Sequence, residues 1–170
     1  GNMGYTGENM LVKQAASWSA VQVGYFLDKY RLAFLKTEFI RMDITGEKLL
    51  HITADDLKGM RVKEKERERL LLAINRDIIW RGSPAMARKW QVVPSKGDIF
   101  FHDSFTKQSQ WDRPQEMLEE LDALGVSLQD VLERGKQKRQ ARLQQALARR
   151  EQQEALKDKG QTLESAIDLT

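Results

Sequence analysis

The residues best suited to acid–base chemistry in this sequence are its two histidines, His51 and His102, and it contains no cysteine. A histidine acts as a general base only beside a nucleophile and an orienting group. His102 follows two phenylalanines in a strand-like run and His51 follows Leu49 and Leu50, so we expect both to be structural. The lack of cysteine excludes disulfides, zinc ribbons, iron–sulfur clusters and thiol nucleophiles. We therefore predict no catalytic residue, no metal or cofactor site, and no enzymatic activity.

Positive charge is concentrated near the C-terminal end, although the net charge of all 170 residues is only +3. Residues 134–150 contain no acid and seven bases: Arg134, Lys136, Lys138, Arg139, Arg142, Arg149 and Arg150. On a helix, such a stretch attracts polyanions, for example an acidic protein surface such as tubulin tails. No large apolar face accompanies it, which argues against membrane insertion. No aromatic residue interleaves it, so nucleic acid is the less favoured partner.

Breaker residues divide the chain at Arg81-Gly82-Ser83-Pro84 and at Pro114. Every Trp and Phe lies before residue 112, so we expect two small cores followed by an arm without a core of its own. The predicted parts are a flexible leader (1–13), a helical domain (14–80), a linker (81–87), a sheet domain (88–114) and a helical arm (115–170). No apolar run approaches the ~20 residues of a membrane span.

The first domain reads as several short helices. Ser19 is a good N-cap, and Val23, Phe26 and Leu27 follow it at helical spacing. Thr53 to Asp56 combines a hydroxyl cap with an acid three residues later, which predicts a second helix start. A last helix is expected from about residue 63 to residue 79.

These residues resemble a sterile alpha motif (SAM) domain over residues 14–80. The most specific stretch runs from Ile44-Thr45-Gly46 through Leu49-Leu50 to Ile52-Thr53-Ala54-Asp55-Asp56-Leu57. The resemblance implies a five-helix bundle that binds other proteins and in many members self-associates head to tail. Two departures are Arg61, where members usually have glycine, and Glu66-Arg67-Glu68, where they have Gly-His-Arg.

Head-to-tail association pairs an acidic surface with a basic one. The resemblance places the acidic surface at Asp43, Glu47, Asp55 and Asp56. It places the basic surface at Lys63, Lys65, Arg67 and Arg69. Because glutamates alternate with these bases, a second interpretation is that both sets are simply solvated.

The second segment predicts three short strands, at Trp90–Pro94, Ile99–His102 and Phe105–Thr106. The spacing of Trp90 and Trp111, with two adjacent phenylalanines between them and Pro114 after them, resembles a WW domain. The resemblance implies a structural cluster of Trp90, Phe101 and Pro114. It implies a proline-peptide groove of Phe100, Trp111, Ser109 and Ser104.

Phe100 stands where family members usually have a tyrosine, whose hydroxyl bonds the ligand backbone. Two interpretations of this segment therefore stay open. It binds a Pro-rich peptide, or it is a packing unit against another surface or against the SAM-like domain.

The third segment predicts a helix from about Pro114 to Gly125 and a second that restarts at Ser127. Large apolar residues are too widely spaced between Leu132 and Leu143 for an autonomous coiled coil, so we expect a docking or solvated helix.

Together these features predict an α+β multidomain protein: a SAM-like helical bundle, a three-stranded antiparallel WW-like sheet and a long polar helix. We expect a non-enzymatic adaptor or structural subunit of a large cytoplasmic assembly, with a cytoskeletal or ciliary setting favoured. The alternative is an RNA-associated protein that binds through residues 134–150 and a basic SAM surface.

Overall fold

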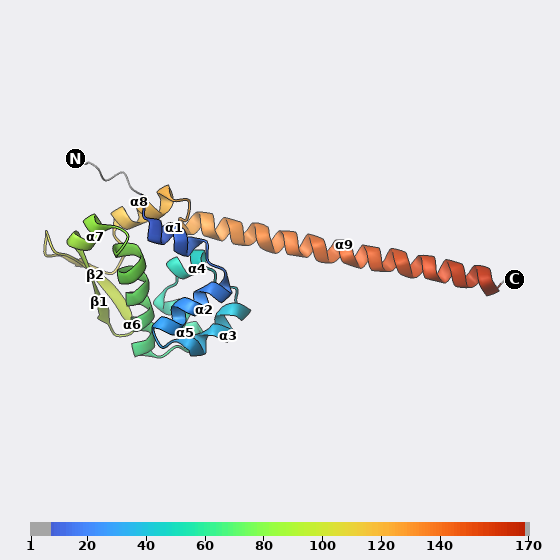
Figure 1. Cartoon of the computed structure of the whole chain (residues 1–170), viewed down its shortest axis with the longest axis horizontal. Helices are drawn as coiled ribbons and strands as arrows, with labels where there is room; N and C mark the ends of the chain where they lie inside the picture. Colours follow the sequence, from blue (N-terminus) through green and yellow to red (C-terminus); the bar gives the residue numbers. More distant parts are fainter. Residues whose placement is uncertain (1–7, 169–170) are drawn as a thin grey trace. The chain divides into compact units, whose positions relative to one another are not determined.

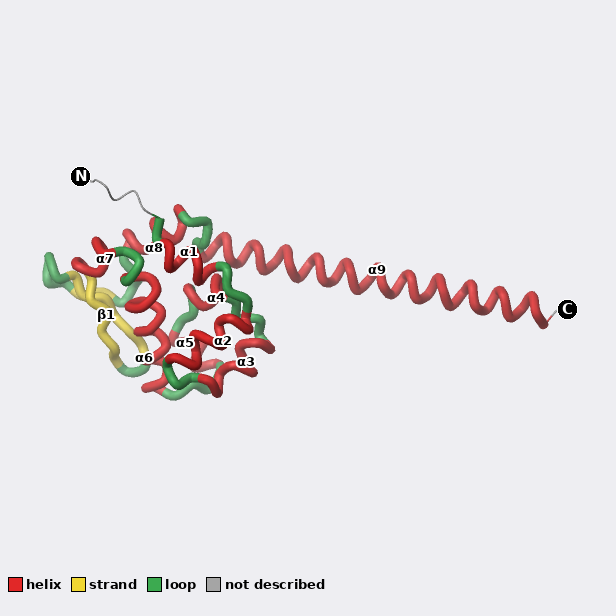
Figure 2. The backbone as a smooth tube through the Cα atoms, viewed as in Figure 1, coloured by secondary structure: helices red, strands yellow, loops and turns green. Residues whose placement is uncertain are grey.

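The structure, a computed structural model, describes residues 8–168 (Figures 1 and 2). Side chains are described as far as residue 160. The chain divides into two compact units between Leu128 and Gln129, and each is described by itself.

The first unit begins with short helices, as the SAM resemblance predicts. They are α1 (Met10–Ala16), α2 (Ala20–Lys29), η1 (Ala33–Leu35), α3 (Lys36–Arg41), α4 (Gly46–Leu50), α5 (Ala54–Gly59), α6 (Glu64–Ala73) and η2 (Ile74–Trp80). Both predicted helix starts are confirmed as capping boxes. Ser19 pairs reciprocally with Gln22, and Thr53 pairs with Asp56. The last helix continues through η2, which has π-helical hydrogen bonding.

The prediction of a flexible leader over residues 1–13 is wrong for its described part, and residues 1–7 lie outside the described residues. The fully buried Asn9 caps α1 by accepting from the Val12 amide, and its side chain donates to the Ile79 carbonyl at 2.8 Å. Val12 and Ala15, one helical turn apart, are buried as well. The N-cap residue Asn9 therefore also attaches the amphipathic helix α1 to the end of η2.

The linker predicted over residues 81–87 is also largely helical. Pro84 occupies the first turn of α7 (Pro84–Lys89), where a proline lacks only an amide hydrogen that would be unpaired anyway. Met86 in this helix is buried. The Gly82-Ser83-Pro84 stretch therefore begins a helix instead of forming a flexible linker.

The three strands are β1 (Trp90–Ser95), β2 (Asp98–Asp103) and β3 (Ser109–Gln110), in an antiparallel sheet of order β1-β2-β3. A two-residue turn joins β1 to β2, with positive φ angles of 53° at Lys96 and 81° at Gly97. Such a turn matches the right-handed twist of the strands. The third strand lies later than the predicted Phe105–Thr106, because the Asp103 carboxylate accepts from both of those backbone amides and holds them in a turn.

One hydrophobic core joins the sheet to the helices, so the prediction of two separate cores is wrong. Ile99 and Phe101 alternate along β2 on the buried face, and both belong to the same cluster as Leu70 and Ile74. The ring of Phe101 meets that of Trp80 edge-on, with centroids 6.2 Å apart. Figure 1 shows α6 between the strands and α5.

The region predicted as one helical arm is divided between the two units. Met117 and Leu121 of α8 (Gln115–Ala123) are buried in the shared core. Gly125, with a φ of +74°, follows the end of α8 as predicted.

The helix α9 (Leu128–Asp168) has no continuous apolar face, and its side chains from residue 136 to residue 160 are exposed. None of the helices within residues 8–168 contains an apolar stretch of the length that a membrane span requires.

Candidate functional site

Two aromatic rings lie together on the face of the sheet opposite the core. Phe100 alternates with the buried Ile99 and Phe101, and its ring lies 5.5 Å from that of Trp111. The planes of the two rings meet at 67°, an edge-to-face arrangement instead of two parallel walls. Trp111 is 59% exposed, which is unusual for so large an apolar side chain. We call this pair the aromatic face.

The two serines predicted for the groove lie in different surroundings. Ser109 pairs with His102 across β2 and β3, and its hydroxyl lies 2.9 Å from His102 Nδ1 on the side of the aromatic face. The Ser104 hydroxyl instead donates to the carbonyls of Arg88 and Lys89 at the end of α7. Ser104 therefore connects the β2–β3 loop to α7.

The predicted structural cluster of Trp90, Phe101 and Pro114 is buried. The Trp90 indole donates to Glu116 at 2.8 Å, and that carboxylate also pairs with Lys89 at 3.2 Å. The indole and lysine hold the pKa of Glu116 below its usual value. These contacts attach the sheet to α8.

The tip of the β1–β2 hairpin rests on the start of α6. Arg67 Nε donates to the Gly97 carbonyl at 3.0 Å, and the Gly97 amide donates to Glu68 at 2.7 Å. A Cβ at residue 97 would lie 2.1 Å from the Arg67 guanidinium, so the contact requires glycine. The carbonyl and the amide of Gly97 are thus bound by two neighbouring side chains of opposite charge, Arg67 and Glu68.

This contact engages part of the predicted basic surface. Arg67 also donates to the Val62 carbonyl, and Arg69 donates to the Tyr30 carbonyl. Lys65 pairs loosely with Glu68 at 3.7 Å and remains highly exposed. Lys63 precedes α6 as its N-cap. The arginines of this surface are therefore used within the chain, whereas the lysines face solvent.

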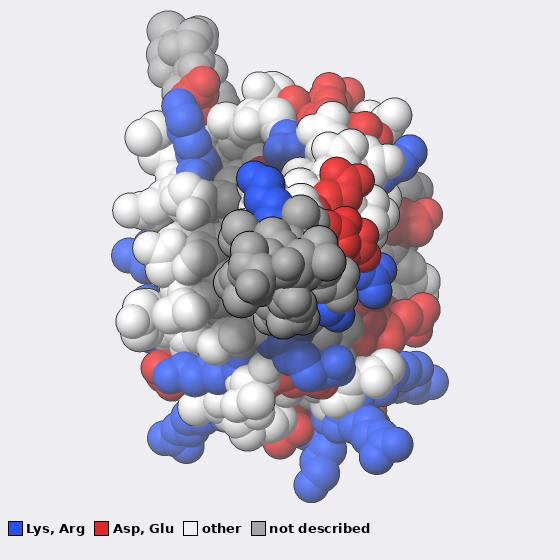
Figure 3. All heavy atoms as spheres, turned by 90° about the vertical axis from the view of Figure 1, so that its right-hand side faces the viewer, with Lys and Arg blue, Asp and Glu red and all other residues white. Residues whose placement is uncertain are grey.

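The four residues of the predicted acidic surface do not share one role. Glu47 lies in the first turn of α4, and Asp43 has a φ of +53° in the preceding loop. Asp56 accepts from the Thr53 amide in the capping box of α5. Asp55, beside it, lines a cleft between the helices and the sheet. Figure 3 shows acidic and basic side chains interspersed on one face, beside an uncharged area.

That cleft, which we call the junction cleft, has a volume of about 270 Å³. Its lining includes Thr53 and Asp55 of the α5 start, Leu71 and Asn75 of the last helix, Asp98 and Phe101 of β2, and Trp111, Asp112 and Arg113 after β3. A larger cleft of about 590 Å³ lies between α7 and α8, where the exposed Phe105 adjoins Glu116 and Glu119.

Arg113 joins the end of the sheet to the end of α4. It donates to the Leu50 carbonyl at 2.6 Å and to His51 Nδ1 at 3.0 Å. Since a guanidinium can only donate, His51 Nδ1 accepts, and Nε2 carries the hydrogen that is donated to the Val126 carbonyl at 2.6 Å. Burial lowers the pKa of Arg113 to about 10, at which the group is still charged at neutral pH. We call Arg113, Leu50, His51 and Val126, with the hydrogen bonds that join them, the His51 joint.

Acid is expected to weaken the His51 joint. Burial lowers the pKa of His51 and the Arg113 charge adds to this, while the Val126 carbonyl and Glu47 oppose it. The unfolded chain therefore binds a proton more readily, so the free energy of unfolding falls as pH drops below about 6.5. Urea denaturation at a series of pH values measures this slope.

The His51→Gln variant should have a smaller slope between pH 7 and pH 5. The matched control His102→Gln changes the other histidine, which lies on the outer side of the sheet and outside the His51 joint. Equal slopes in wild type and His51→Gln would contradict the proposed neutral histidine.

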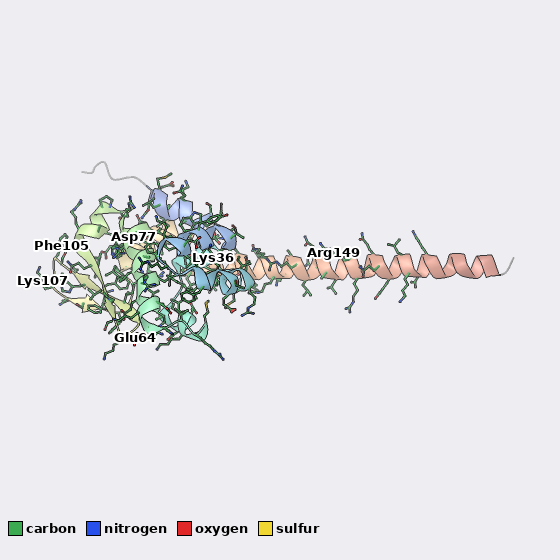
Figure 4. The ribbon with its side chains drawn as sticks, turned by 60° about the horizontal axis from the view of Figure 1, so that its bottom comes forward. Lys36, Glu64, Asp77, Phe105, Lys107 and Arg149 are labelled. Atoms are coloured by element: carbon green, nitrogen blue, oxygen red, sulfur yellow. The ribbon has the colours of Figure 1, made fainter. Side chains whose placement is uncertain are left out.

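The seven basic residues predicted for residues 134–150 all lie on α9 (Figure 4 labels Arg149). At about 100° per residue, Arg134, Lys138, Arg142 and Arg149 fall within about 80° of one another around the helix axis. The described side chains leave α9 on all sides, and its apolar residues Leu143, Leu147 and Leu156 are exposed. The helix thus carries a basic stripe without an apolar seam.

Comparison with known protein families supports the helical part of this description. Residues 16–76 match the family model of the SAM domain (sterile alpha motif), so the predicted SAM domain is confirmed there. SAM domains are generally non-catalytic modules that bind other proteins or self-associate. No curated protein and no solved structure matches the chain. The sheet lies outside the matched residues, and its WW likeness remains a prediction.

Proposed function

We propose that this chain is a non-enzymatic adaptor whose SAM domain carries a WW-like sheet that binds a proline-containing peptide. The observation that carries the proposal is the aromatic face. One side of the sheet is buried against α6, while Phe100 and Trp111 lie in contact on the other side with Trp111 largely exposed. A sheet kept only for packing has no need of an exposed tryptophan, because such surface favours aggregation or binding.

A polyproline II helix fits such a face for a physical reason. It is preformed and presents a rigid apolar ridge, so aromatic rings bind it at a small entropic cost. Phe100 lacks the hydroxyl that a tyrosine would offer to the ligand backbone. His102 and Ser109, on the same side of the sheet, supply polar groups beside the rings. The ligand is therefore expected to gain most of its affinity from Trp111.

The contact between the start of α6 and the hairpin tip limits how the SAM domain could self-associate. Arg67 binds the hairpin tip, so a head-to-tail partner at this surface would have to displace Gly97 or use Lys63 and Lys65 alone. We therefore place protein contacts of the SAM domain at its acidic side in preference to the start of α6.

The basic stripe of α9 suits an acidic protein surface. Tubulin tails are one such surface, and a cytoskeletal or ciliary assembly in the cytoplasm is the setting we propose. The stripe has no aromatic neighbours, so base stacking contributes nothing to its binding.

The Trp111→Ala variant is expected to lose at least about tenfold in affinity for the best binder from a Pro-rich peptide library. A ring that stacks on a ligand at an interface contributes about 2 kcal/mol or more. Fluorescence anisotropy with the labelled peptide and the full chain measures the loss.

Phe105→Ala is the matched control, because Phe105 is also an exposed aromatic, 68% accessible, but lies in the β2–β3 turn away from Phe100. It should bind like wild type. If wild type binds no peptide in the library, the peptide-binding role is wrong and the sheet serves packing alone.

A further inference from the structure

The lining of the junction cleft contains more acidic than basic residues. Three acidic residues line it from three separate segments: Asp55 at the start of α5, Asp98 at the start of β2, whose Oδ1 accepts from the Ile99 amide at 2.7 Å, and Asp112 after β3. The single cation in its lining is Arg113, whose NH1 and NH2 groups donate to His51 and Leu50. A ligand here meets more negative than positive charge.

A buried amide in the lining has an unused acceptor. Asn75 is 2% exposed, and its Nδ2 donates to the Leu71 carbonyl one turn earlier at 2.8 Å. Its Oδ1 has no hydrogen-bond partner among the described residues. A buried acceptor without a partner is destabilising, so a donor that enters the cleft and bonds to Asn75 Oδ1 would recover part of that cost.

The arrangement of the carboxylates does not suit a metal ion. Within the part of the chain that the structure describes, no three acidic or histidine side chains are close enough to hold one. Carboxylates spread around a cleft of about 270 Å³ instead suit a larger cation with several donors. A guanidinium is planar, carries five N–H donors and is weakly hydrated.

Trp111 is a second feature of the cleft that favours a guanidinium ligand. It lines the cleft as well as the aromatic face, and 59% of its surface is exposed. An indole ring attracts a cation placed over its face, most often the side chain of arginine. Acidic residues and a largely exposed tryptophan in one lining are complementary to a guanidinium on a flexible stem.

We propose that the junction cleft binds the guanidinium of an arginine side chain from a partner protein. This site is distinct from the proline-peptide site, since Asp55 and Asn75 belong to the helices, and Trp111 is the one residue that the cleft lining shares with the aromatic face. It also exists only because the sheet packs on the SAM domain, so neither part alone would contain it.

Nuclear magnetic resonance titration of the full chain tests this site with the blocked peptide acetyl-Gly-Arg-Gly-amide. We expect the amide signals of Asp98 and Asp112, the Asn75 side-chain amide and the Trp111 indole signal to shift together. The citrulline peptide keeps the shape but lacks the charge, and it should bind at least about tenfold more weakly, the difference a charge-assisted hydrogen bond supplies.

The Asp55→Asn/Asp98→Asn double variant keeps side-chain size, and it should lose at least about fivefold in affinity for the arginine peptide. Asp122→Asn removes a carboxylate from α8, away from the cleft lining, and should bind like wild type. Retained binding of a Pro-rich peptide by the double variant would separate this site from the aromatic face.

Three outcomes would overturn the proposal. They are equal binding of the arginine and citrulline peptides, shifts centred on Glu116 and Glu119 in the other cleft, and an unchanged affinity in the double variant.

Discussion

The Phe101→Ala variant is expected to lose about 3–5 kcal/mol of unfolding free energy, the usual cost of truncating a buried phenylalanine. Phe101 is 3% exposed and packs edge-on against Trp80 at the end of the last SAM helix. Because this ring lies in the core that joins sheet and helices, the loss should affect both together. A sheet with its own core would melt alone and leave the helices at wild-type stability.

Urea denaturation distinguishes these cases when it is followed by far-UV circular dichroism for the helices and by the nuclear magnetic resonance amide signals of β1 and β2 for the sheet. We expect the two signals to change at one shared midpoint, lowered equally in the variant. Phe105→Ala is the control, because Phe105 is also in the sheet segment but 68% exposed. It should change the unfolding free energy by less than about 0.5 kcal/mol. Two separate midpoints in wild type would contradict the shared core.

Short-range features of this fold could be predicted from the sequence because a few neighbouring residues determine them. The capping boxes at Ser19 and Thr53 need only residues three positions apart. The hairpin turn at Lys96 and Gly97 needs a residue that accepts positive φ between two strand-like runs. The SAM pattern extends this reasoning to residues 16–76, where the family match agrees.

Contacts between distant segments could not be predicted in this way. Nothing in Glu66-Arg67-Glu68 indicates that Arg67 and Glu68 form hydrogen bonds with the backbone of Gly97 in the β1–β2 turn. The sequence instead suggested a basic surface that faces solvent. The aromatic residues of the second segment were assigned to a core of their own, whereas Phe101 shares Trp80 with the helices. Glu68 lies one helical turn before Leu71, and this position on the apolar face of the helix is a signal in the sequence that could have indicated a buried acid with an internal partner.

The same limit applies to the candidate sites. The WW resemblance implied Phe100 and Trp111 as a pair, and their rings do lie 5.5 Å apart, because Trp111 directly follows β3, which pairs with the strand that carries Phe100. The junction cleft was missed because its walls come from the SAM helices and from the sheet, and sequence patterns do not show how two such parts pack. Asp55 was assigned to a SAM surface for the same reason.

Replacement of Arg113 by methionine is expected to cost about 2–4 kcal/mol of unfolding free energy. Methionine preserves much of the buried volume but removes the donors to the Leu50 carbonyl and to His51 Nδ1. Leu50 ends α4, so its carbonyl has no partner within the helix and depends on this cation. Each buried acceptor left without a donor costs about 1–3 kcal/mol.

The exposed Arg88→Met on α7 is the matched control, and chemical denaturation at pH 7.5 should find it within about 0.5 kcal/mol of wild type. Burial is the main cause of the lowered pKa of His51, and the Arg113 charge adds to it, so the Arg113→Met variant should depend somewhat less on acid than wild type. A large loss of stability with an unchanged pH slope would mean that Arg113 acts through Leu50 alone. A loss below about 0.5 kcal/mol would show that the His51 joint does not hold the sheet to α4.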